Sequence, residues 1–193
     1  WTRKRMTMRK YLALILAFVA VPAFADHPGD RLDEVMAQKE PAFRAVDLAA
    51  VPSLDLLGPD GEPIDLDSLS DQVIVLSFAP TNCGAPCVEQ QEILTKVREG
   101  VNASPMLNMV TFLIVSDAED LSTGLVAENV IVAQPEPPIE TLIEEYRAFA
   151  SDTREGPLVH VIARGNRHAG IFDGAAFRHI NMILYVNGLT NEH

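Results

Sequence analysis

Basic side chains are scarce in this sequence. It contains 15 Lys and Arg against 27 Asp and Glu among 193 residues, which gives a formal net charge of −12 at pH 7. Such a surface repels nucleic acid and anionic lipid, so we exclude both as partners. The acidity suits a protein that meets basic partners or cations, although it could equally serve only to keep the protein dispersed.

Long apolar runs are also missing. The longest covers residues 11–21, and even when extended through Phe24 it falls short of the roughly 20 residues that span a bilayer as a helix. Basic residues precede this run, and Ala23 and Ala25 place small side chains where a signal peptidase reads them. We therefore predict that residues 1–25 are a secretory signal and that the protein is periplasmic. It would touch the membrane only through a partner or through an uncleaved signal used as an anchor.

The rest of the chain has the length of one ordinary domain. Removal of residues 1–25 leaves 168 residues with 10 basic and 27 acidic side chains, a net charge of about −17. That length is sufficient to bury a hydrophobic core. We expect residues 26–45 to form a loose or short helical lead-in and residues 46–193 to form the domain.

Apolar patterning predicts alternating strands and helices across that domain. Continuous β-branched and aromatic runs are typical of buried strands, and apolar residues at helical spacing are typical of helices packed on a sheet. The expected strands cover residues 54–57, 64–66, 73–79, 109–115, 158–163 and 169–172, the expected helices cover 86–98, 138–149 and 180–186, and a surface loop covers 134–138. This order indicates an α/β, thioredoxin-like fold, with a central mixed sheet flanked by helices and an N-terminal β-hairpin extension.

Only two cysteines occur, Cys83 and Cys87. They lie where the strand predicted at 73–79 leads into the helix predicted at 86–98. Residues four apart share a helix face, so the two sulfurs can close a disulfide or hold one metal ion between them. Soft thiolates select Cu(I), with zinc possible. An inert structural disulfide is the alternative, but the loop that it would close is too small to stabilise the fold much.

The two sulfurs are expected to differ in reactivity. Backbone N–H groups and the positive end of a helix favour the thiolate, which can bring a cysteine pKa into the range of about 3.5–7.5. Gly84 allows a tight turn, and Pro86 falls in the first turn of the helix, where its missing N–H costs nothing. We expect Cys83 to be the exposed nucleophile and Cys87 to be its more buried partner.

Several segments together carry a resemblance to a known family. They are Leu-Gly-Pro-Asp-Gly at 57–61, Phe-Ala-Pro-Thr-Asn-Cys-Gly-Ala-Pro-Cys at 78–87, Ile-Val-Ser-Asp at 114–117, the helix expected over 139–149 with Tyr146, and the turn at 165–167. On these residues the chain, from about residue 54 to residue 189, resembles the Sco/SenC proteins, thioredoxin-fold factors that help to assemble the copper centre of cytochrome c oxidase. The C-x3-C spacing is a fairly specific part of the resemblance, since thioredoxins use C-x2-C.

The resemblance implies one of two functions. In the first, the protein is a thiol–disulfide oxidoreductase: reduced Cys83 attacks a disulfide of the copper-accepting subunit of cytochrome c oxidase, or of another periplasmic thiol protein, and Cys87 resolves the mixed disulfide. In the second, the protein is a copper metallochaperone that carries the metal on its two cysteines and a histidine without turnover.

The family takes its third copper ligand from a histidine that precedes the strand leading into the turn at 165–166. The matching position lies near residues 154–156, where this chain has Arg154 and Glu155. His160 is the nearest replacement, and we name it as the candidate third ligand beside the two cysteines. Its place inside an apolar strand is also, and more commonly, that of a hydrogen-bonded core histidine.

Four further positions complete these expectations. Val88 follows the second cysteine, where the family usually has proline. His168 and His179 are expected at the surface. Pro157 stands where thioredoxin-like oxidoreductases place a cis proline that shapes the groove for their partners, so it is a candidate for a cis peptide bond.

Overall fold

The structure of the protein is a computed structural model that describes residues 31–48, 51–118, 127–150 and 156–192. The signal predicted at residues 1–25 lies outside the described residues. Within the described part of the chain, each helix is too short or too polar to cross a bilayer.

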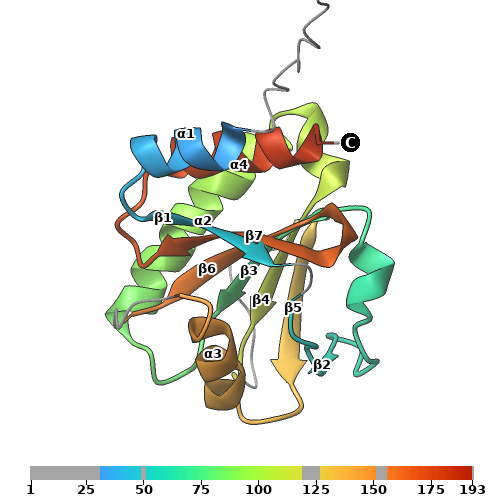
Figure 1. Cartoon of the computed structure of the whole chain (residues 1–193). Helices are drawn as coiled ribbons and strands as arrows, with labels where there is room; N and C mark the ends of the chain where they lie inside the picture. Colours follow the sequence, from blue (N-terminus) through green and yellow to red (C-terminus); the bar gives the residue numbers. More distant parts are fainter. Residues whose placement is uncertain (1–30, 49–50, 119–126, 151–155, 193) are drawn as a thin grey trace, which may run out of the picture.

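A seven-stranded sheet forms the centre of the molecule (Figure 1), in the order β1-β7-β6-β3-β4-β5-β2. Its strands are β1 (Phe43–Leu48), β2 (Leu56–Leu57), β3 (Val73–Phe78), β4 (Val110–Val115), β5 (Val130–Pro135), β6 (Leu158–Ala163) and β7 (Arg167–Asp173). Strands β3, β4 and β5 run parallel, whereas β6 is antiparallel to β3 and β7 is antiparallel to β6. The sheet is therefore mixed, as the sequence predicted.

Helices cover both faces of this sheet. They are α1 (Leu32–Lys39), α2 (Ala85–Asn102), α3 (Ile139–Arg147) and α4 (His179–Thr190). One hydrophobic cluster joins α1, α2 and α4 to a sheet face, and a second joins α3 and the β2 segment to the opposite face (Figure 1). Strands β3, β4 and β6 are buried along their whole length, because both faces are covered. This layering confirms the α/β, thioredoxin-like fold.

The N-terminal hairpin is short. Strand β2 meets Pro63 through a single bridge beyond the turn at 58–62, where the Gly58 amide donates to the Glu62 carbonyl at 2.8 Å. Residues Leu66–Leu69 form a short 3-10 helix, and the Asp65 side chain accepts a hydrogen bond from the Asp67 amide.

Two strands lie where the sequence predicted none. Strand β1 starts inside the lead-in expected at 26–45 and pairs antiparallel with β7. Strand β5 pairs with β4 and ends at Pro135, which lies within the loop expected at 134–138, and it bonds β2 on its other side. Strand β1 lies at the sheet edge, where its sequence alternates apolar and charged residues, whereas β5 begins with a short apolar run, Val130 to Ala133, for which no strand was predicted.

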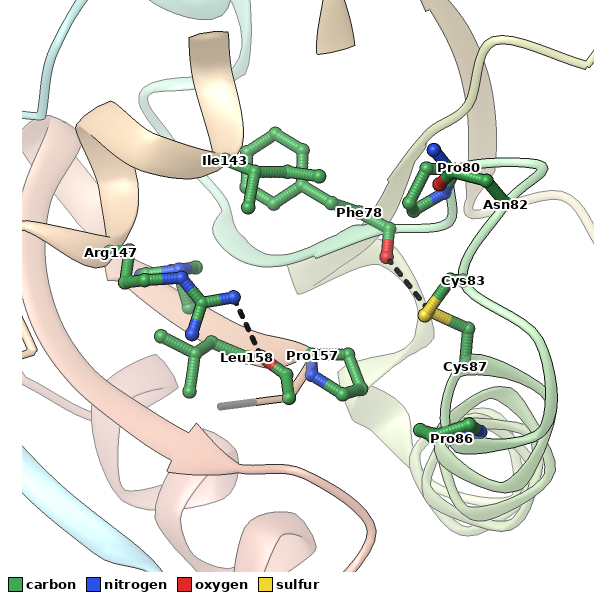
Figure 2. A pocket seen from close by; sticks show the side chains of 12 residues that line it. Phe78, Pro80, Asn82, Cys83, Pro86, Cys87, Ile143, Arg147, Pro157 and Leu158 are labelled. Carbon is green, nitrogen blue, oxygen red and sulfur yellow. Dashed lines mark hydrogen bonds between the residues drawn. A yellow bond between two sulfur atoms is a disulfide. The ribbon is translucent and has the colours of Figure 1, made fainter. Parts of the chain in front are cut away.

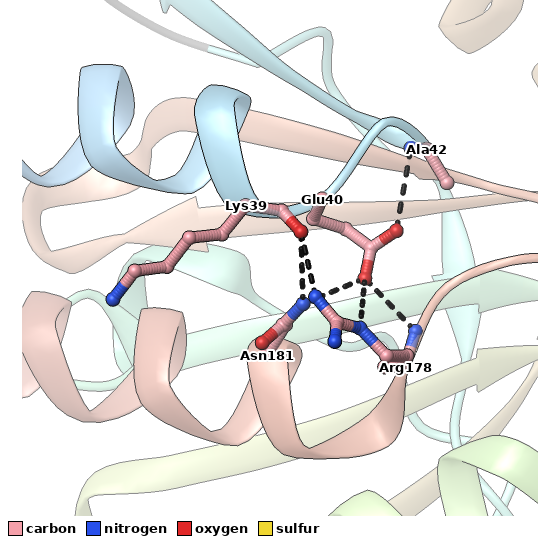
Figure 3. A network of polar contacts seen from close by, with 5 residues as sticks. All are labelled: Lys39, Glu40, Ala42, Arg178 and Asn181. Atoms are coloured by element: carbon pink, nitrogen blue, oxygen red, sulfur yellow. Dashed lines mark hydrogen bonds and ion pairs between the residues drawn. The ribbon is translucent and has the colours of Figure 1, made fainter.

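A buried carboxylate joins the end of α1 to the start of α4 (Figure 3). The Glu40 side chain accepts hydrogen bonds from the Arg178 amide at 3.0 Å, the Asn181 side chain at 2.9 Å and the Ala42 amide at 3.4 Å. The Arg178 guanidinium also donates to the Lys39 carbonyl at 2.7 Å. Burial alone would raise the pKa of Glu40, but these hydrogen bonds and the charge of Arg178 outweigh it, so the pKa is lowered. The segment before β1 is thus fixed to the rest of the fold.

Candidate functional site

Strand β3 leads directly into the loop that carries the first cysteine. The Ala79 amide donates to the Val115 carbonyl at 2.8 Å, and the Ser116 hydroxyl donates to the Ala79 carbonyl at 2.7 Å. Beyond them, the Asp117 carboxylate accepts from the Thr81 amide at 2.8 Å and from the Thr81 hydroxyl at 3.3 Å. The residues that follow β4 therefore hold the cysteine loop in place.

The second cysteine lies in the first turn of α2. Gly84 precedes this helix with a φ of 69°, a left-handed conformation that favours glycine, and Pro86 occupies the first turn. Cys83 and Cys87 form a disulfide, with their Cα atoms 5.8 Å apart. The loop and the helix start thus place the two sulfurs together as the spacing predicted.

The two cysteines differ in exposure. Cys83 is half-buried, whereas Cys87 is buried, with its sulfur 4.0 Å from the Phe78 carbonyl oxygen (Figure 2). An incoming thiol or disulfide reaches the sulfur of Cys83 more easily. This is the order of exposure that the sequence predicted.

A pocket of about 290 Å³ opens beside the disulfide. Most of its walls are apolar, and they come from β3, the cysteine loop, α2, α3, the segment before β6 and β6 itself. The described residues that line it are Phe78, Pro80, Asn82, Cys83, Pro86, Cys87, Ile143, Arg147, Gly156, Pro157, Leu158 and His160 (Figure 2). Such a concave apolar site next to a reactive group is a natural place for part of a substrate.

The wall that faces the cysteines has little free backbone to offer. The Gly156 carbonyl accepts from the Arg147 guanidinium at 2.8 Å, and the Pro157 carbonyl accepts from the Gly174 amide at 2.9 Å. The peptide bond at Pro157 is trans, so the cis proline considered from the sequence is not found. Proline also has no N–H, so this wall offers a partner side-chain contacts and few main-chain hydrogen-bonding groups.

His160 lies in β6 opposite Leu76 of β3 and lines the same pocket. Its ring is 1 % exposed, and its Nδ1 atom lies 3.2 Å from the Nε2 atom of His168. Tyr146 contacts the ring edge to face, with ring centroids 5.1 Å apart. Burial, followed by the charges of His168 and Arg147, holds the pKa of His160 well below its usual value, so the ring is neutral at pH 7.

No three His, Cys, Asp or Glu side chains of the described residues lie close enough to hold one metal ion. His160 lines the pocket but does not form a three-ligand set with Cys83 and Cys87. Arg154 and Glu155, which occupy the family's expected histidine position, lie outside the described residues.

The prediction that His168 lies at the surface is wrong. Its side chain is fully buried, because β7 turns this residue toward the ring of His160. Burial lowers the pKa of His168 to about 4. His179, in contrast, is exposed at the start of α4, as predicted.

Comparison of the sequence with models of protein families gives no match, and comparison with curated proteins finds no relative. Solved structures do match. BsSco, a member of the Sco family of cytochrome c oxidase assembly proteins, superimposes with a TM-score of 0.60 at 13% identity, covering 77% of this chain and 96% of BsSco. Yeast Sco1 with copper bound gives 0.59 at 9% identity, covering 76% and 95%. A thiol:disulfide interchange protein of the thioredoxin family from Chlorobium tepidum TLS gives 0.51 at 18% identity, covering 77% and 98%.

Fold and site together define a thioredoxin-fold protein with a disulfide at the start of a sheet-covering helix. Among proteins of that fold, the structures that this chain resembles include several Sco proteins, in agreement with the Sco/SenC resemblance of the sequence. At identities this low, the structural likeness shows a shared fold alone.

Proposed function

We propose that this protein is a periplasmic Sco/SenC-like assembly factor for the copper centre of cytochrome c oxidase, which acts by thiol–disulfide exchange. The observation that carries this proposal is the asymmetric pair at the start of α2: a half-buried Cys83 joined to a buried Cys87 beside an apolar pocket. An inert cross-link needs neither the difference in exposure nor the pocket.

The exchange proceeds in two balanced steps. In the reduced protein the Cys83 thiolate attacks one sulfur of a partner disulfide, a mixed disulfide forms, and the other partner sulfur leaves as a thiolate. Cys87 then loses its proton to solvent, and its thiolate attacks the sulfur of Cys83. The Cys83–Cys87 disulfide forms again, and the partner departs with both sulfurs reduced and able to accept copper.

A trapping experiment tests this function. In a Cys87→Ser variant the second step cannot occur, so the mixed disulfide with the copper-accepting subunit of cytochrome c oxidase should accumulate and be seen as a covalent adduct in non-reducing gels. The Cys83→Ser variant is the matched control and should give no adduct. Equal trapping by both variants, or by neither, would contradict the proposal.

Copper transport is the second candidate function, favoured by two adjacent sulfurs, since thiolates are the donors that Cu(I) prefers. The reduced pair could hold copper as cargo, and the copper-bound yeast Sco1 has the same fold. The described residues supply two ligands rather than three, which fits Cu(I) better than Cu(II). His160 as a third ligand requires the ring or the cysteine loop to move.

A further inference from the structure

The pocket beside Cys83 has a composition that the exchange chemistry alone does not require. Its apolar walls include Phe78, Ile143 and Leu158, which come from three different elements. Of the described residues that line it, only Arg147 carries a positive charge, and its guanidinium donates to the Gly156 carbonyl within the pocket wall. The space is therefore suited to an apolar side chain.

The loop that carries Cys83 lies between two exposed carboxylates. Asp117 accepts from Thr81, and Glu140 lies 3.4 Å from the side-chain amide of Asn82, which donates to it. Among the described residues, neither carboxylate forms an ion pair with a basic side chain. A partner that brings its sulfur to Cys83 therefore meets two negative charges that contact the cysteine loop, Asp117 and Glu140, which we call the negative rim.

Main-chain pairing offers a partner little on the facing wall. The carbonyls of Gly156 and Pro157 already accept hydrogen bonds from Arg147 and Gly174, and Pro157 has no N–H. An extended partner that pairs with this wall through β-type hydrogen bonds would have to share these two carbonyls with their present donors. Side-chain fit and charge remain as the sources of selectivity.

We propose that this site selects a cysteine-containing polypeptide segment in which an apolar residue next to the cysteine enters the pocket and basic flanking residues meet the negative rim. The proposal rests on the exchange function above and specifies its substrate class. The apolar contact should dominate, because burial of one large aliphatic side chain is worth roughly a tenfold gain in affinity or more. The exposed charges contribute a smaller, salt-dependent gain.

Binding can be tested separately from chemistry. Acetylated and amidated pentapeptides are titrated into the oxidised full chain and followed by NMR, with aminobutyrate in place of the central cysteine so that no exchange can occur. We expect Lys-Leu-Abu-Leu-Lys to bind roughly tenfold more tightly than Lys-Ser-Abu-Ser-Lys. It should also bind about two- to fivefold more tightly than Glu-Leu-Abu-Leu-Glu at low salt, and this second difference should shrink at high salt. Equal affinity for the leucine and serine peptides overturns the proposal.

Two matched pairs of variants locate the two contacts. Ile143→Thr puts a hydroxyl into the pocket wall and should reduce the preference for leucine to about threefold or less. Val88→Thr introduces a hydroxyl at an exposed position of α2 that does not line the pocket, and it should leave the preference unchanged. Glu140→Gln should remove part of the preference for lysine, whereas Glu99→Gln at the far end of α2 should not. An equal effect in the members of either pair overturns the proposal.

The cysteine forms of the same peptides, activated as thionitrobenzoate mixed disulfides, separate this proposal from the exchange function. Cys83 attacks the peptide sulfur, thionitrobenzoate leaves as a coloured thiolate, and Cys87 then releases the peptide thiol. If the peptides bind selectively but release thionitrobenzoate no faster than they do with glutathione, the pocket is supported and the exchange function is refuted. Fast release with no preference among the peptides refutes the pocket and supports exchange.

Discussion

The Nδ1 atom of His160 lies 3.2 Å from the Nε2 atom of His168, and both rings are almost completely withdrawn from solvent. One nitrogen must carry the proton of this hydrogen bond while the other accepts it, which suits two neutral rings. Burial lowers the pKa of both groups, to about 4 for His168. The pair is therefore neutral, and His160 presents this neutral ring to the pocket.

This pair should make stability depend on pH. The unfolded chain gains protons as the pH falls through about 6.5, whereas the folded chain leaves His168 neutral down to about 4, so stability is lost across that window. Each histidine can contribute a loss of about 1.4 kcal/mol per pH unit. His168→Gln, which keeps a hydrogen-bonding group, should flatten the slope by up to that amount in urea unfolding at pH 7, 6 and 5. Identical slopes in the variant and the wild type would contradict the assignment.

The contact between Asp117 and Thr81 should set the redox balance of the disulfide. Asp117→Ala removes two hydrogen bonds from the cysteine loop and should destabilise the oxidised form by about 1 kcal/mol. The reduction potential, measured by equilibration with glutathione, should become less negative by about 20 mV. Asp60→Ala, which removes a similar side-chain bond to the Glu62 amide in a different turn, should leave the potential unchanged.

Cys83 should react faster than Cys87 with alkylating reagents in the reduced protein. The half-buried position of Cys83 in the loop admits the reagent, whereas the helix and the end of β3 cover Cys87. A rate difference of about tenfold is expected when the first-labelled residue is identified by peptide mass spectrometry. Equal rates at the two positions would argue against Cys83 as the nucleophile, and absence of reaction at both would favour an inert disulfide.

The Glu40 network predicts that the segment before β1 contributes to stability. Glu40→Ala leaves the Arg178 amide and the Asn181 side chain without their carboxylate partner and should cost about 2 kcal/mol in the free energy of unfolding. Glu34→Ala, in the helix α1 that precedes Glu40, is the matched control. It removes an exposed ion pair with Arg31, 3.4 Å long, and should change stability by less than about 1 kcal/mol. Equal losses of stability in the two variants would contradict a stabilising role for the Glu40 network.

The central part of the fold could be predicted because burial leaves a simple pattern. Strand β3 was expected at 73–79 and is found at Val73–Phe78, since a strand covered on both faces must be apolar throughout. Strand β1 escaped prediction because Arg44 and Asp47 interrupt its sequence, and its place is set by pairing with β7. Such pairing depends on residues far away in the chain, which local patterning does not report.

The candidate site likewise has parts that the sequence could predict and parts that it could not. The position of Cys83 and Cys87 follows from their spacing at a strand-to-helix junction, which is a local property. The hydrogen bond from Thr81 to Asp117 joins two segments that follow different strands. The sequence of neither segment alone indicates this pairing. The burial of His168 depends on the register of the β6–β7 hairpin, which shifts between Val161 and Ile162. A one-residue shift changes the face on which a side chain lies, so the surface assignment failed.

Copper binding provides the sharpest test of how the two cysteines are used. The reduced protein should bind one equivalent of Cu(I) in a two-coordinate thiolate site, because that ion tolerates low coordination and prefers sulfur. Cu(II), which favours four ligands with nitrogen donors, should bind weakly, since no three-ligand group exists among the described residues. Competition with a chromogenic Cu(I) chelator should show that Cys83→Ser and Cys87→Ser each lower the affinity by at least about 100-fold, whereas His160→Ala leaves it unchanged. A stable Cu(II) complex with an intense sulfur-to-copper charge-transfer band that disappears in His160→Ala would instead show that the imidazole moves to join the two sulfurs.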